Sequence, residues 1–353
     1  MLDIIFAVLL TPTILFTLPS YRSGLGKDKK ILQAVLAGVS NVKSLLLEEN
    51  EIGKGDNGEE GLSLVADFIK SNDEVIILSL ANNDIDHKKK SEVIAKAMRK
   101  NSTIQEMCLG DQKLDIRPFL ASRKLTESLS HLDLGRCNLR TAGSRLVASF
   151  IKKNPPLSSL NLEKNGIPTP TAANWGEALL VNDNLEHLNL HGNSFNDKSI
   201  DTWKEILKSN RTLRTLNLSG NNIKAKPKRY QRSANGWGWE RITNPVHVRK
   251  DFILDSMCDS TSIKSILESN HTCQLFIANN NNGVYETNEL AMRKINKLDN
   301  EGLKIRHKVV LSMFKLNKEL FDSRMFNDIP LELVSLSCNM VWLLCLLPLN
   351  IIY

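Results

Sequence analysis

The chain has 353 residues, of which 42% are hydrophobic and 24% are charged, with 18 Gly and 11 Pro. This composition is typical of a folded protein and excludes a collagen-like or wholly disordered chain. The formal net charge is +7, but residues 224–250 alone carry eight basic side chains and one acidic one, and the rest of the chain is neutral. The charge therefore does not indicate nucleic-acid binding over the whole surface.

The cysteines and sequons bear on the cellular compartment. The six cysteines show no C-x-x-C pair and no regular disulfide spacing: Cys108, Cys137, Cys258, Cys273, Cys338 and Cys345. This pattern favours reduced thiols and a cytoplasmic protein. Four N-x-S/T sequons exist, at Asn101, Asn210, Asn217 and Asn270. Asn217 arises from the repeat motif described below, so it is poor evidence for secretion.

The N-terminal residues 4–18 form an uncharged apolar stretch. A secretory signal would need a basic segment before the stretch and a small-residue cleavage site after it, and neither is present. An alternative is a degenerate first repeat, since Leu15, Leu18 and Leu25 fit positions 1, 4 and 11 of the repeat motif. We expect residues 1–25 to be such a repeat or an apolar cap, with a signal or anchor as the alternative.

Residues 26–223 repeat one eleven-residue motif. Its copies read VKSLLLEENEI from Val42, VIILSLANNDI from Val75, IQEMCLGDQKL from Ile104, LSHLDLGRCNL from Leu129, LSSLNLEKNGI from Leu157, LEHLNLHGNSF from Leu185 and LRTLNLSGNNI from Leu213. Positions 1, 4, 6 and 11 are apolar in all seven copies, and the last four copies start 28 residues apart. The pattern L-x-x-L-x-L-x-x-N/C-x-L is that of leucine-rich repeats.

Each repeat is predicted to be a strand, a loop and a helix. Between the motifs, segments such as GLSLVADFIKSN and TAGSRLVASFIKKN place apolar residues at the spacing of an amphipathic helix. The fold class is therefore an α/β leucine-rich repeat solenoid, or horseshoe, with parallel strands on the concave face and helices on the convex face. Over residues 15–285 the chain resembles the ribonuclease-inhibitor-like family, including the repeat regions of NOD-like receptors.

Motif position 9 is Asn, Gln or Cys in every copy. A short polar side chain there can hydrogen-bond to the backbone of the turn that follows the strand. Gln112 is the poorest fit, so we expect the third repeat to be the most irregular.

After Ile223 the repeat is interrupted. Residues 224–250 are basic, contain Trp237 and Trp239, and show no helical or strand period. Degenerate repeats are expected at 251–285, where Leu275, Ile277 and Asn280 fit motif positions 4, 6 and 9. Charged closing helices are expected at 286–330. The phrases SIKSILESNHTCQLF, KIRHKVV and IPLEL resemble the terminal part of leucine-rich repeat proteins of unicellular algae.

The tail, residues 331–353, ends in 21 residues without a charge. About 20 apolar residues can cross a bilayer as a helix, but serines, asparagines and Pro348 interrupt this stretch. We expect a cap on the last repeat, with a membrane anchor as the alternative.

The expected partner-binding surface is the concave face. Motif position 5 becomes more polar towards the C-terminal repeats, so we predict a site for a protein partner there. Its candidate residues are His131, Asp133, Asn161, Glu163, His187, Asn189, His191 and Asn217. A solvated face without a ligand is the alternative reading. A basic patch of Lys224, Lys226, Lys228, Arg229 and Arg232 gives a second hypothesis, binding of nucleic acid or an anionic membrane through residues 224–250.

The sequence predicts no enzyme, no catalytic residue, no cofactor and no metal. It contains no nucleophile elbow, P-loop or H-E-x-x-H motif. His187 and His191 lie about 13 Å apart on one strand, too far to share a metal. The predicted function is a non-enzymatic protein-interaction scaffold. Two alternatives remain: a regulator of a small GTPase, an activity of some proteins of the resembled family, and a membrane-tethered recognition protein.

Overall fold

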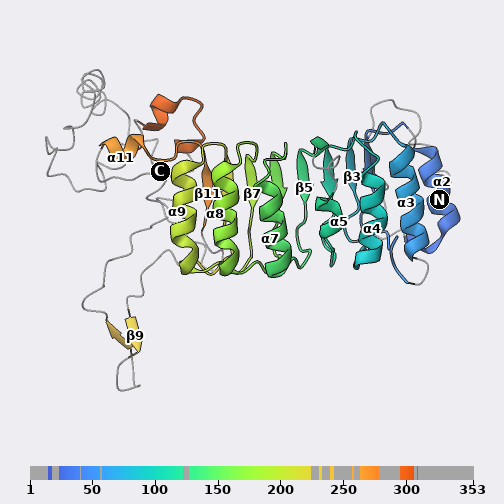
Figure 1. Cartoon of the computed structure of the whole chain (residues 1–353), viewed down its shortest axis with the longest axis horizontal. Coiled ribbons are helices and arrows are strands. Elements are labelled where there is room, and N and C mark those ends of the chain that lie inside the picture. The colour runs from blue at the N-terminus through green and yellow to red at the C-terminus, as the bar shows by residue number, and fades with distance from the viewer. Residues whose placement is uncertain are drawn as a thin grey trace. The chain divides into compact units, whose positions relative to one another are not determined.

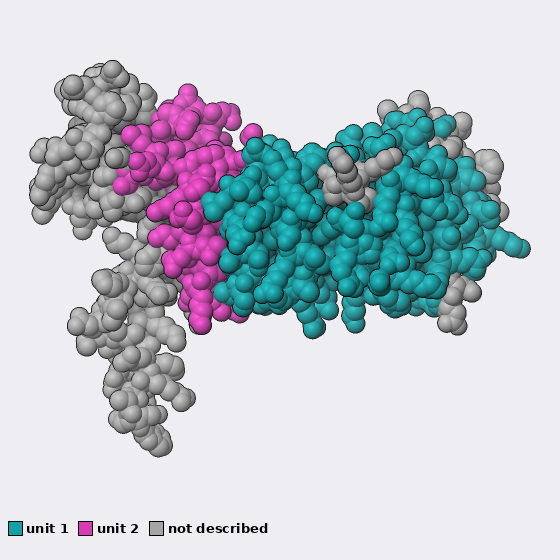
Figure 2. Space-filling model, in the orientation of Figure 1, with its two compact units in different colours: residues 1–194 teal, residues 195–353 magenta. Residues whose placement is uncertain are grey.

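The computed structural model describes residues 15–17, 24–39, 41–55, 58–121, 127–223, 230–232, 239–241, 257, 263–277, 295–305 and 308. The chain divides into two compact units, residues 1–194 and residues 195–353, which Figure 2 shows in different colours.

Unit 1 contains one parallel strand for each motif copy up to Leu185, preceded by an additional N-terminal strand. In chain order the strands are β1 (Leu15–Thr17), β2 (Ser44–Leu46), β3 (Ile77–Ser79), β4 (Glu106–Cys108), β5 (His131–Asp133), β6 (Ser159–Asn161) and β7 (His187–Asn189). Each pairs in parallel with the next. From β2 onward, motif positions 3, 4 and 5 lie opposite their counterparts, so Leu132 faces Met107 on one side and Leu160 on the other. The predicted leucine-rich repeat solenoid is confirmed.

The helices of unit 1 lie side by side on one face of these strands (Figure 1). They are η1 (Leu25–Lys27), α2 (Lys29–Gly38), α3 (Gly58–Ser71), α4 (Lys88–Met98), α5 (Arg117–Leu120), α7 (Arg140–Ile151), η2 (Thr169–Thr171) and α8 (Ala172–Val181). In α3 the buried residues Leu62, Val65 and Ile69 recur at helical spacing. Motif position 4 of each strand is buried against this layer, as Leu45, Leu78 and Leu188 show.

The first strand, β1, lies within the N-terminal apolar stretch, and its register differs from the alignment expected from the repeat motif. Leu15 pairs with Ser44, which occupies motif position 3. The expected alignment placed Leu15 at position 1, so the observed register differs by two residues.

Unit 2 contains the motif that begins at Leu213 and one later copy. Its elements are η3 (Asp197–Ser199), α9 (Ile200–Ser209), β8 (Thr215–Asn217), β9 (Tyr230–Arg232), β10 (Trp239–Arg241), α11 (Ile263–Leu267) and β11 (Gln274–Phe276). β11 pairs in parallel with β8, with Leu275 opposite Leu216. Leu275 and Ile277 are buried, as their predicted motif positions require. Asn280 lies outside the described residues.

Strands β9 and β10 lie within residues 224–250, where the sequence shows no strand period. They pair in antiparallel fashion, with Arg232 opposite Trp239. The sequence between them contains Asn235–Gly236, a dipeptide that favours tight β-hairpin turns.

The two apolar ends and most of the basic patch stay untested. Residues 4–14 and the tail 331–353 lie outside the described residues, as do Lys224, Lys226, Lys228 and Arg229, while Arg232 lies in β9. In the part of the chain that the structure describes, no helix is long and apolar enough to span a bilayer.

Candidate functional site on the strand face

A ladder of buried side chains at motif position 9 holds the turns that follow the strands. In Asn165, the Oδ1 atom accepts hydrogen bonds from the N–H groups of Cys137 (2.9 Å) and Leu139 (3.2 Å) in the preceding repeat. Its Nδ2 atom donates to the carbonyl of Leu134 (2.8 Å). Asn193 repeats this arrangement one repeat further on. Because a buried N–H without a partner costs about 1–3 kcal/mol, this ladder fixes the loop geometry.

Gln112 does not disturb this ladder, contrary to expectation. Its Oε1 atom accepts from the N–H groups of Asn83 (3.3 Å) and Ile85 (3.0 Å), and its Nε2 atom donates to the carbonyl of Leu80 (3.2 Å). The irregularity of the third repeat lies elsewhere. Its helix α5 has 4 residues, whereas α4 has 11. The next rung of the ladder is Cys137, whose thiol donates to the carbonyl of Leu109 (3.2 Å).

The face of β5, β6 and β7 opposite the helices, here called the strand face, presents three rows of side chains. In the first row, at motif position 3, the register places His131, Ser159 and His187 next to one another. Both histidines are exposed and Ser159 is half-buried. The Nδ1 atom of His131 lies 2.8 Å from Ser130 Oγ. These side chains are therefore available to a partner.

The second row, at motif position 5, is a hydrogen-bonded chain of half-buried side chains. Asn161 Nδ2 donates to Asp133 Oδ1 (3.0 Å), and Asn189 Nδ2 donates to Asn161 Oδ1 (2.9 Å). Each acceptor oxygen also receives a backbone N–H two residues further along its own strand, as Gly135 donates to Asp133 (2.8 Å). The side chains of this row hydrogen-bond to one another and to the backbone, and these bonds hold them in fixed orientations.

The third row, at motif positions 7 and 8, carries the charge. Glu163 accepts from Asn189 Nδ2 (3.4 Å) and lies 3.4 Å from Arg136 Nε. Arg136 also reaches Asp111 Oδ1 at 3.3 Å, so one guanidinium joins carboxylates from two neighbouring repeats. With Asp133 beside them, carboxylates outnumber cations at the centre of the strand face.

Seven of the eight predicted site residues thus come together on the strand face of unit 1. His191 is half-buried, and its N–H donates to Asn189 Oδ1 (3.0 Å). The eighth, Asn217, belongs to unit 2, where its Oδ1 atom accepts from the N–H of Ser219 (3.1 Å). Among the described residues, no three His, Cys, Asp or Glu side chains are grouped so that they could hold a metal ion.

Sequence reasoning missed a row of mostly charged residues in left-handed backbone conformation at motif position 8. Positive φ angles between 49° and 58° occur there at Glu49, Asn82, Asp111, Arg136 and Lys164. The equivalent residues of the last two copies are Gly192 and Gly220, also with positive φ. Glycine adopts this conformation without steric cost, so these glycines were the available signal. The charged side chains occupy the same conformation at a cost.

A second row of buried asparagines explains the sequons as structural residues. Asn101 is 5% exposed, its Nδ2 atom donates to the carbonyl of Ile69 (3.0 Å), and its Oδ1 atom accepts from the N–H of Ile104 (3.0 Å). Asn210 and Asn270 are buried in the same way. These amides are enclosed in the fold, so none of these three sequons is accessible in the folded chain.

Residues 184–206 and 212–229 match the family model described as Leucine Rich Repeat. The chain therefore contains leucine-rich repeats. Such repeats generally mediate protein–protein interactions, because stacked units create an extended binding surface. The narrower assignment to the ribonuclease-inhibitor-like subclass stays a prediction.

Three solved structures are similar to this chain at low identity. The leucine-rich repeat-containing protein LegL7 of Legionella pneumophila is 16% identical over 84% of this chain and 80% of its own, with a TM-score of 0.43. Internalin C2 of Listeria monocytogenes is 14% identical over 57% of this chain and 86% of its own, with a TM-score of 0.28. The actin-binding site 2 of leiomodin-1 is 18% identical over 48% of this chain and 80% of its own, with a TM-score of 0.27. No curated protein matches the sequence significantly.

Proposed function

We propose that this protein is a non-enzymatic recognition module whose strand face on β5–β7 binds a polypeptide partner that offers hydrogen-bond donors and basic side chains. The observation that carries this proposal is the hydrogen-bonded row of Asp133, Asn161 and Asn189. A row that is already satisfied loses little conformational entropy when a partner docks, and low ordering cost favours affinity.

The chemistry of the partner follows from the groups that flank this row. Glu163 and Asp133 place carboxylates at the centre of the strand face, while Arg136 is shared between Asp111 and Glu163. An opposite charge on the partner raises the association rate and the specificity. His131 and His187 are exposed beside the row and would contact the partner directly.

A peptide-selection experiment tests this proposal. Random peptides displayed on phage are selected on the immobilised full-length protein, and enrichment of sequences rich in Lys and Arg is expected. The double variant His131→Ala/His187→Ala and the single variant Glu163→Gln should each weaken the selected peptides about tenfold, or about 1.4 kcal/mol. The matched control is His87→Ala, an exposed histidine before α4 and away from the strand face.

Enrichment of acidic peptides, or equal affinity for the wild-type protein and the strand-face variants, would show that the proposed surface is wrong. Neither regulation of a small GTPase nor membrane tethering is favoured by an observation on the described residues. Binding of nucleic acid or anionic membrane through residues 224–250 likewise stays a hypothesis.

A further inference from the structure

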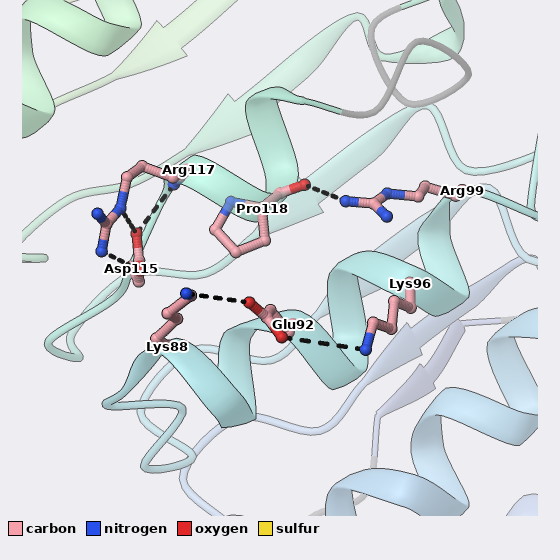
Figure 3. A pocket seen from close by; sticks show the side chains of 7 residues that line it. All are labelled: Lys88, Glu92, Lys96, Arg99, Asp115, Arg117 and Pro118. Carbon is pink, nitrogen blue, oxygen red and sulfur yellow. Dashed lines mark hydrogen bonds and ion pairs between the residues drawn. The ribbon is translucent and has the colours of Figure 1, made fainter.

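A hollow of about 390 Å³ lies beside α4, away from the strand face (Figure 3). We call it the α4–α5 pocket; it is lined by Lys88, Glu92, Lys96, Arg99, Asp115, Arg117 and Pro118. It occurs where the row of helices contains its shortest described α-helix, because α5 has 4 residues between α4 with 11 and α7 with 12. A single helical turn covers less of a neighbouring helix than three turns do, so the described residues leave one side of α4 uncovered.

The α4 side of the pocket carries a stripe of weakly paired charges. Lys88, Glu92 and Lys96 follow one another at intervals of four residues, so they share one face of the helix (Figure 3). The lysine Nζ atoms lie 3.8 Å and 3.9 Å from the Glu92 carboxylate, and both lysine side chains are more than half exposed. Exposed pairs of this kind contribute about 0–1 kcal/mol, so either lysine can turn to another anion at little cost.

The α5 side contains one closed ion pair. Arg117 binds Asp115 with two hydrogen bonds, Nε to Oδ1 at 2.8 Å and Nη2 to Oδ2 at 2.7 Å. This hydrogen bonding holds the pKa of Asp115 below its usual value, against the opposing effect of burial. Asp115 therefore stays ionised and is neutralised by its own neighbour.

The positive charge of Arg99 is not paired with a carboxylate of the pocket lining. Its Nη2 atom donates to the carbonyl of Pro118 at 3.4 Å, a neutral acceptor, which fixes the guanidinium at the edge of the pocket (Figure 3). Within the described residues Arg99 makes no ion pair. The lining thus has four cations and two carboxylates, with Lys96 one helical turn from Arg99.

We propose that the α4–α5 pocket binds an acidic segment of a polypeptide, with Arg99 and Lys96 receiving a carboxylate. A planar guanidinium beside a mobile ammonium suits a carboxylate group. Nucleic acid fits less well, because Glu92 and Asp115 would repel a continuous row of phosphates. Among the described lining residues there is also no aromatic side chain to stack on bases. This site is distinct from the strand face and goes beyond the proposed function.

Fluorescence anisotropy with the full-length protein tests this site. The probe is a fluorescein-labelled hexaglutamate peptide, and hexaglutamine is the matched uncharged probe. Hexaglutamate should bind, hexaglutamine should not, and added salt should weaken binding. The double variant Lys96→Gln/Arg99→Gln should lower the affinity at least tenfold. The double variant Lys30→Gln/Arg145→Gln makes the same change in net charge at exposed positions on α2 and α7, and it should bind as the wild type does.

Several outcomes would overturn the proposal. Equal loss of affinity in both double variants would mean that net charge alone attracts the peptide. Tighter binding of a labelled oligothymidine that is lost in the pocket variant would make the site a nucleic-acid site. The single variant Arg99→Lys keeps the charge and should retain most of the affinity for hexaglutamate. Retained binding in this variant would show that the loss in the double variant comes from the missing charges and not from misfolding. His131→Ala/His187→Ala should leave hexaglutamate binding unchanged. The pocket proposal can therefore fail while the strand-face proposal holds, and the reverse.

Discussion

The backbone N–H of Leu114 donates to the carbonyl of Gln112 within its own turn, with an N···O distance of 2.9 Å. In neighbouring repeats the equivalent N–H donates to the position-9 side chain of the following repeat. Ile85 donates to Gln112 Oε1 (3.0 Å), and Leu139 donates to Asn165 Oδ1 (3.2 Å). The exception arises because the next rung is Cys137. The thiol sulfur is a weak hydrogen-bond acceptor, whereas an asparagine Oδ1 atom at this position accepts two N–H groups.

Cys137→Asn is therefore expected to stabilise the protein by about 1 kcal/mol, the usual net value of one hydrogen bond. Asn occupies this position in most other repeats, so the side chain fits the ladder. The measurement is the urea midpoint by circular dichroism. Asn165→Cys is the reverse change and should destabilise the protein, since Cys137 and Leu139 would lose their acceptor. A lower midpoint for Cys137→Asn would contradict this account of the third repeat.

The thiols described by the structure are expected to be unreactive in the folded protein. Burial raises the pKa of Cys137 and of Cys273 to about 12, and it also raises the pKa of Cys108. With a pKa near 12, only about one thiol in ten thousand is ionised at pH 8, and the thiolate is the reactive form. Maleimide labelling followed by peptide mass spectrometry should modify these cysteines only in denaturant. Rapid labelling of Cys137 in buffer would show that its repeat opens.

The strand-and-helix architecture was predictable because each motif copy repeats the same apolar periodicity. The strand face followed from alternation along the strands, which placed His131, Asp133 and Asn161 correctly. The α4–α5 pocket was not predictable, because it depends on the length of α5, and no residue at Arg117–Leu120 marks where a short helix ends. The two-residue difference in the register of β1 was not predictable either, since the leucines of the apolar stretch can be aligned with the motif in several ways.

Lys164→Gly is expected to raise the free energy of unfolding by about 0.5–1 kcal/mol. Lys164 has φ 49°, a conformation that is unfavourable for a residue with a side chain and favourable for glycine. Lys113→Gly is the matched control, because Lys113 is also exposed in a turn of the repeat but is not among the positive-φ residues; there glycine should destabilise. Thermal unfolding of both variants is the measurement, and equal shifts of the same sign would contradict the conformational explanation.

Lowering the pH should destabilise unit 2 through His271. His271 is buried, its Nε2 atom lies 3.2 Å from the carbonyl of Leu267, and its Nδ1 atom lies 3.1 Å from Lys308 Nζ. Burial, and then the charges of Lys308, Arg211 and Lys304, lower its pKa from 6.5 to about 4. Between these values the unfolded chain binds a proton that the folded chain does not, so stability falls as the pH drops from about 6.5 to about 4.

The pKa difference of His271 corresponds to at most about 3.5 kcal/mol of unfolding free energy, since one pKa unit is worth about 1.4 kcal/mol. The measurement is the urea midpoint at pH 7.5, 6 and 4.5, and His271→Gln should remove most of the loss between pH 7.5 and 4.5 because glutamine does not titrate. His87→Gln, which changes an exposed histidine, is the control and should keep the wild-type pH dependence. The same loss of stability in His271→Gln would show that carboxylates elsewhere, and not this buried imidazole, set the acid sensitivity.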